Sequence, residues 1–415
     1  MENLAKQLTV KYTLLQCTYW ISQCAIYSFA AVFLQSRNFN NTQIGIVLAL
    51  AAILSILLQP LVASFADKTT KVSLRQIVIV LMAAVYILAL LLYIAPDSFW
   101  LVAVLYILIN AFSFTLNPLF NSLALEYMNL GVPMNYGLSR GIGSVAFAVM
   151  SFLLGRVVTQ FGAGILLNIF LITYCFAIAS AIFFQVKLPQ NMLSADLNPG
   201  SLNSLTQSDS ENEPKAPSGI LTFFIKYKLF MLFLCGVAMI FYSHSLINTY
   251  LINIMEAAGG GSTDMGISLS IAATLELPAM AGFIFIVKKY KCSRLVVVSA
   301  FFFLVKVFIT WLAPSVWMIH LSQTCQLISY ALFTPASVYY VNSIMDKYDR
   351  VKGQAMLGVA TIGIAGSVAN ITGGKILDTL GVSDMLLLGT WVTAVGVIII
   401  AFTAREPRQN AAAKE

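Results

Sequence analysis

A chain of 415 residues in which 59% are hydrophobic and only 10% are charged does not have the composition of a soluble domain. Its formal charge of +7 does not indicate a nucleic-acid partner, because the cations lie between apolar runs and not in one basic patch. Six isolated cysteines without CxxC spacing and two histidines predict neither a disulfide framework nor a metal site.

The first part of the chain holds six apolar runs of membrane-spanning length, separated by short polar links. The first run is long and is followed by weak cleavage signals, so we expect a retained helix and not a signal peptide. The runs cover residues 12–34, 44–66, 77–94, 100–125, 136–158 and 165–186.

Residues 188–218 are rich in Ser, Asn, Pro and acidic residues, and they interrupt this pattern near the middle of the chain. Such a segment cannot bury enough apolar area to fold alone, which predicts a flexible cytoplasmic linker. It would separate an N-terminal half, residues 1–187, from a C-terminal half, residues 219–415. Six further apolar runs follow, over residues 229–254, 265–287, 295–313, 316–341, 356–376 and 385–404.

The sequence therefore predicts an all-α polytopic membrane protein with twelve transmembrane helices in two pseudo-symmetric six-helix halves. Halves of this kind place their substrate site at the interface, near the bilayer midplane. Most lysines and arginines fall on the side that holds the N-terminus, so both termini are expected in the cytoplasm and the protein in the plasma (inner) membrane. The other side receives only Arg37, Arg156 and Lys375.

Glu126 and Arg140 flank a short turn that contains Gly131 and Pro133, each at the end of an otherwise uncharged segment. One interpretation is a helical hairpin with a surface salt bridge, since such pairs are common and weak. The other is a buried charge pair beside a transport pathway. Glycines cluster around the arginine at positions 137, 141 and 143.

Glu276 and Lys306 each lie about eleven residues into an apolar run, or roughly 16 Å deep in a hydrocarbon core about 30 Å thick. The two runs are antiparallel, so the charges can meet. A structural ion pair is one interpretation. The other is that Glu276 binds a proton or a substrate donor, with Lys306 as its partner.

Aromatic and amide side chains share faces of the first, seventh and tenth runs, and they suit the rings and hydroxyls of sugars or nucleosides. Interfacial anchoring and helix–helix contact are the competing interpretations. The candidates are Tyr19, Trp20, Gln23 and Tyr27 in the first run, Asn248 with His244 in the seventh, and Gln323 and Gln326 in the tenth.

The twelve runs and central linker resemble the major facilitator superfamily over almost the whole chain. Residues 63–75 resemble its loop motif, in which Asp67, Lys68 and Lys71 match, whereas Ala63 replaces the usual glycine. The resemblance implies a gating role for this loop.

More specifically, YGLSRGIGSVAFA and TLELPAM resemble the oligosaccharide–proton symporter group that contains lactose permease, and related sugar and nucleoside permeases. The resemblance implies substrate binding by Arg140, with Glu126 about one turn from the family's partner acid. It also implies proton coupling by Glu276 with Lys306. Two departures stand out: Phe147 replaces the tryptophan on which galactosides stack, and Gln326 and Ser329 replace a tenth-helix histidine and glutamate.

No nucleotide-binding motif accompanies these segments, so neither enzymatic activity nor a cofactor is expected and an ion gradient would supply the energy. The expected function is proton-coupled uptake of a small polar organic solute, a sugar or oligosaccharide first, by a monomer in the lipid bilayer. A nucleoside permease and a drug or metabolite exporter are alternatives. A non-transporting receptor is more remote, because no large cytoplasmic domain is present.

Overall fold

The computed structural model describes residues 2–69, 72–129, 132, 134–185, 220–346 and 348–405. They form helices joined by short turns, and no strand occurs within these ranges. The N-terminal half contains α1 (Glu2–Gln23), the π-helix η1 (Cys24–Ser28), α2 (Ala30–Ser36), α3 (Asn41–Lys68), α4 (Leu74–Ile94), α5 (Phe99–Asn129), α6 (Tyr136–Phe161) and α7 (Ile165–Phe183).

The C-terminal half opens with the short helix α9 (Ile220–Lys226) and then repeats the helical pattern. Its elements are α10 (Lys228–Thr249), α11 (Leu251–Ala257), α12 (Ser262–Lys289), α13 (Cys292–Trp311), α14 (Val316–Thr324), the 3-10 helix η3 (Cys325–Leu327), α15 (Tyr330–Ile344), α16 (Arg350–Gly358), the π-helix η4 (Val359–Ala365), α17 (Gly366–Thr379) and α18 (Val382–Thr403).

The predicted fold class is confirmed, although three of the predicted spans, the first, the seventh and the tenth, are not straight continuous helices. Among the described residues, ten helices are long and apolar enough to cross a membrane, and α1 with α2 makes an eleventh across a 50° bend. The tenth predicted run, residues 316–341, is divided into α14 and α15 by η3. Hydropathy did not reveal this division, because both pieces are apolar. The division matters for the site, because Gln326 lies in η3 between the two pieces.

The first membrane span of each half ends in the same way, which supports the pseudo-symmetric arrangement. A single non-helical residue, Phe29 or Tyr250, precedes a seven-residue helix, α2 in the first half and α11 in the second. The proposed linker, residues 188–218, lies outside the described residues, so the boundaries of the halves stay predictions.

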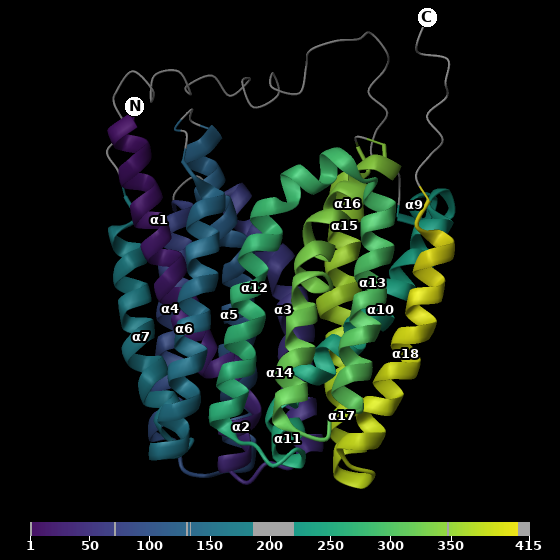
Figure 1. Ribbon diagram of the computed structural model, residues 1–415. Coiled ribbons are helices and arrows are strands. Elements are labelled where there is room, and N and C mark those ends of the chain that lie inside the picture. Colours follow the sequence, from purple (N-terminus) through teal and green to yellow (C-terminus); the bar gives the residue numbers. More distant parts are fainter. Residues whose placement is uncertain are drawn as a thin grey trace, which may run out of the picture.

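The two halves stand side by side, and the start of α1 lies at the same end of the molecule as the end of α18 (Figure 1). The main contacts between halves are made by two helix pairs, α6 with α12 and α3 with α17. These are pseudo-equivalent pairs, since α3 and α12 are the second helix of their half and α6 and α17 the fifth.

Glycines allow both pairs to approach at the end away from the termini. A Cβ on Gly155 of α6 would lie 3.0 Å from the Cα of Gly266 in α12. A Cβ on Gly45 of α3 would lie 2.0 Å from the carbonyl oxygen of Asn370 in α17. Close backbone approach of this kind is how small residues join membrane helices.

Hydrogen bonds reinforce the same end. The carboxylate of Asp378, at the end of α17, accepts bonds from the backbone N–H and side chains of Asn41 and Thr42, at 2.6–3.2 Å. An acidic group at the N-terminus of α3 also interacts favourably with the helix dipole. Thr159 of α6 bonds to Thr263 of α12 at 2.9 Å. The halves are therefore closed against each other away from the termini.

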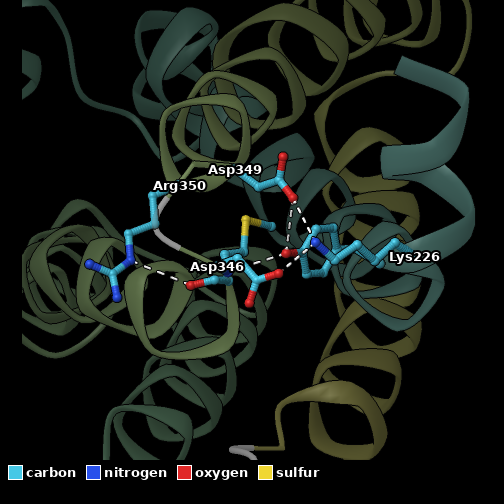
Figure 2. Close-up of polar contacts among 6 residues, drawn as sticks. Lys226, Asp346, Asp349 and Arg350 are labelled. Atoms are coloured by element: carbon cyan, nitrogen blue, oxygen red, sulfur yellow. Dashed lines mark hydrogen bonds and ion pairs between the residues drawn. The ribbon is translucent and has the colours of Figure 1, made fainter. Parts of the chain in front are cut away.

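At the opposite end, a polar cluster fixes the entry of the chain into α10 (Figure 2). Lys226 donates to Asp346 at 2.6 Å and to Asp349 at 3.0 Å, and the Tyr227 hydroxyl also donates to Asp349. These hydrogen bonds raise the pKa of Lys226 above its usual value. The cluster ties α9 and α10 to the turn between α15 and α16.

Candidate functional site

Three polar side chains form a continuous chain of hydrogen bonds inside the C-terminal half. Lys306 Nζ donates to Gln326 Oε1 at 2.7 Å, and Gln326 Nε2 donates to Glu276 Oε1 at 3.1 Å. Within the described ranges no direct ion pair joins Glu276 to Lys306, so Gln326 mediates the contact that the sequence left open. Lys306 is 1% exposed. Such a buried ammonium is costly unless it is hydrogen-bonded, and this bond and the nearby carboxylate meet that need.

The broken tenth span explains how Gln326 can use both ends of its amide. The residue lies in η3, between the end of α14 and the start of α15, and its side chain is buried. Glu276 lies in α12, two residues before Pro278, which leaves the carbonyl of Thr274 without its helical N–H partner. Irregular backbone at membrane depth is typical of sites that bind solutes or ions.

A histidine on α10 extends this polar region. His244 Nε2 lies 2.9 Å from Asn248 Nδ2, and its ring stacks on Tyr330 at 5.0 Å. The other ring nitrogen, Nδ1, is buried and has no hydrogen-bond partner within the described structure. Two edge-on rings, Phe241 and Phe303, enclose the imidazole.

The N-terminal half contributes Arg140 from the first turns of α6. Its guanidinium lies over the indole of Trp20, 4.5 Å from the ring centroid, and it donates to Ser144 Oγ at 3.2 Å. A Cβ on Gly141 would lie 2.6 Å from Leu277 Cδ1, so the residues that follow Arg140 and Glu276 are in contact. Arg140 on α6 and Glu276 on α12 therefore lie on two helices that pack together, and Gln326 links Glu276 to Lys306. The two halves thus bring a cation and a carboxylate to one interface.

The other predicted substrate residues lie along the first and fifth spans. Phe147 meets the Trp20 ring edge-on at 6.3 Å. Gln23 is buried, and its Nε2 has no partner among the described atoms. Tyr27 lies in η1 and packs edge-on against Phe114 at 4.9 Å.

Among the described residues, Glu126 is not joined to this constellation. Glu126 is exposed near the end of α5, and among the described residues no ion pair joins it to Arg140. Arg140 instead contacts the indole of Trp20 and the hydroxyl of Ser144. The side chains of Asp67 and Lys68, at the end of α3, and the whole of Lys71 lie outside the described structure.

Three site contacts were not anticipated from the sequence. Trp20 underlies Arg140, Ser144 bonds to it, and Tyr330 stacks on His244. Helical spacing offered a signal for one of them, because Ser144 follows Arg140 by four residues. The other two contacts, Trp20 with Arg140 and Tyr330 with His244, join residues of different spans and have no local signal.

Two six-helix halves with a polar, partly charged constellation at their interface define a membrane transport protein. The chain belongs to the MFS_1 like family, a branch of the major facilitator superfamily, whose model matches residues 12–388. The expected resemblance at superfamily level is thereby confirmed.

Individual relatives agree with this assignment. A maltose permease of Geobacillus stearothermophilus is 25% identical over 393 residues, which cover 92% of this chain and 91% of that protein. The uncharacterized transporter YwbF of Bacillus subtilis (strain 168) is 25% identical over 354 residues, 85% of this chain and 82% of the relative. Crystal structures of the nucleoside transporter NupG share the fold. One has a TM-score of 0.72 at 16% identity and covers 97% of this chain and 98% of its own.

Proposed function

We propose that this protein is a secondary active transporter that takes up a small polar organic solute together with protons, and that the solute is a sugar or oligosaccharide. The observation that carries the proposal is the bridge from Lys306 through Gln326 to Glu276, facing Arg140 across the interface of the halves. The likeness to a maltose permease favours a saccharide.

In this proposal, Glu276 binds the transported proton. Its carboxylate accepts a hydrogen bond from Gln326, which links it to Lys306, and its helix α12 packs against α6, which carries Arg140. Protonation removes its negative charge, so the balance between Glu276, Arg140 and Lys306 changes with proton binding. Arg140 binds substrate hydroxyls with its planar donors, which can serve two oxygens at once.

Alternating access follows from the interface geometry. The contacts at Gly45, Gly155 and Asp378 close the end away from the termini, and they must separate when the site opens there. No cofactor is required, because the proton gradient supplies the energy. One chain in the bilayer contains both halves of the site, so we propose a monomer.

A counterflow experiment tests the proposed function. Proteoliposomes loaded with unlabelled maltose should accumulate labelled maltose transiently, whereas protein-free liposomes should not. Parallel loading with glucose or uridine separates the saccharide from the nucleoside alternative. Counterflow of uridine but of neither sugar would establish a nucleoside permease, and loss of lipophilic cations without uptake of any of these would indicate an exporter.

The orientation of the chain is tested by labelling. We propose that both termini and residues 188–218 are cytoplasmic, because the cations gather on that side. In a cysteine-free variant, Asn203→Cys should react with an impermeant maleimide only after permeabilisation. Ser98→Cys, in the exposed turn before α5, is the matched control and should react in intact cells. The reverse pattern would invert the topology.

A further inference from the structure

The indole of Trp20 is the largest aromatic surface beside Arg140, and it is partly exposed. The guanidinium covers one ring face at 4.5 Å, and Phe147 meets the indole edge-on at 6.3 Å. Gly143 of α6 lies against the ring, since a Cβ there would be 3.2 Å from Trp20 Cδ1. A small residue at this point lets α6 approach the indole closely.

Hydrogen bonds fix the orientation of this indole. Trp20 Nε1 donates to Gln16 Oε1 at 3.0 Å, Gln16 Nε2 donates to the Tyr12 hydroxyl at 2.7 Å, and that hydroxyl donates to the carbonyl of Phe120 at 3.2 Å. Tyr12 and Gln16 are buried. Because the N–H group is already used, Trp20 can offer a ligand only its ring face.

We propose that Trp20 is the platform on which a saccharide ring stacks, and that Arg140 and Trp20 together form one substrate subsite. The face of an indole is electron-rich and attracts either a cation or the slightly positive C–H groups of a pyranose. A sugar ring on this face takes the place of the guanidinium, whose donors then bind the hydroxyls at the edge of the ring. This inference rests on the proposed function and deepens it.

What distinguishes Trp20 from a tryptophan of the core is its partial exposure and the guanidinium on its ring face. Its hydrogen bond holds the ring plane in advance, and a stacking platform gains affinity from being held in this way. Phe147 is the competing platform, but its ring meets Trp20 by an edge and carries no cation on its face among the described contacts. We therefore assign the stacking role to α1 and not to α6.

Tryptophan fluorescence tests the proposal in the folded protein. Trp100, Trp317 and Trp391 are 76%, 82% and 66% exposed, so replacing these three and Trp311 by Phe leaves Trp20 as the single emitter. Maltose should change the emission of this protein saturably. No change on adding maltose, in a protein that still transports it, would overturn the proposal. A change with uridine alone would overturn the saccharide assignment.

Substitutions provide a second measurement, the dissociation constant of maltose. Trp20→Leu should weaken binding about tenfold or more, because it removes both the stacking area and the aromatic face. Trp20→Phe should weaken it less, and Trp20→Leu combined with Phe147→Trp should recover part of the loss by returning an indole to the subsite. Trp100→Leu, at an exposed position, is the control and should bind as the parent does.

The outcomes separate the two proposals. If the parent protein shows no counterflow of maltose or glucose, the proposed function fails. If the parent transports maltose but Trp20→Leu binds it within about twofold of the parent, only the assignment of Trp20 fails.

Discussion

Glu276→Gln should abolish accumulation of the substrate against a gradient while substrate exchange across the membrane continues. Glutamine resembles a protonated glutamate in shape, and its amide oxygen can still accept the bond that Gln326 Nε2 donates to Glu276. The variant thus stays in the equivalent of the proton-loaded state. Exchange requires no net proton movement, so it persists, whereas coupled uptake requires the proton to leave.

The size of this effect follows from the proton gradient. One pH unit corresponds to about 1.4 kcal/mol, so one proton per substrate can drive at most about tenfold accumulation for each unit. Proteoliposomes with an imposed gradient of one unit should approach that ratio with the parent protein and stay near unity with Glu276→Gln. Equal accumulation by both would place the coupling elsewhere, and Glu126 would then be the next carboxylate to test.

Arg140→Lys should impair transport nearly as severely as Arg140→Ala, by roughly 30-fold or more in initial uptake. The structure places the guanidinium of Arg140 over an indole, and the guanidinium donates a hydrogen bond to Ser144. Lysine keeps the charge but has neither the planar surface nor two donors in a fixed fork. Uptake of labelled maltose at matched expression measures this effect.

The same helix offers a matched control. Arg156 of α6 also lies over an aromatic ring, that of Phe152 at 4.3 Å. It is exposed, however, and it follows Arg140 by sixteen residues, near the other end of the helix. Arg156→Lys should therefore transport at nearly the parental rate. Near-normal uptake by Arg140→Lys would show that Arg140 acts only as a charge.

Hydropathy predicted the helices well and their ends less well. The second run was expected over residues 44–66, and the observed helix α3 extends over Asn41–Lys68. Its start is fixed by a capping box between Asn40 and Gln43, which hydropathy does not detect. The breaks at Tyr250 and at η3 were missed because apolar residues continue on both sides.

The candidate site was predictable residue by residue but not as a network. Depth along a span singled out Glu276 and Lys306, whereas the intervening amide of Gln326 depends on a helix break with no hydropathy signal. Glu126 shows the opposite failure. Proximity in sequence to Arg140 favoured a pair, but the guanidinium contacts an aromatic ring and a hydroxyl instead. These contacts do not require a second charge to be buried.

At the end away from the termini, residues of both halves form a shared surface, which exists only in the conformation in which that end is closed. Asn41 bonds to Asp378, and Thr159 bonds to Thr263; each bond joins the two halves and exists only while its helix pair is joined there. An antibody fragment raised against this composite surface would bind the closed form and not the separated one. Its binding energy would then hold the population in this conformation. Such a fragment, added from the side away from the termini, would arrest the cycle without entering the substrate path.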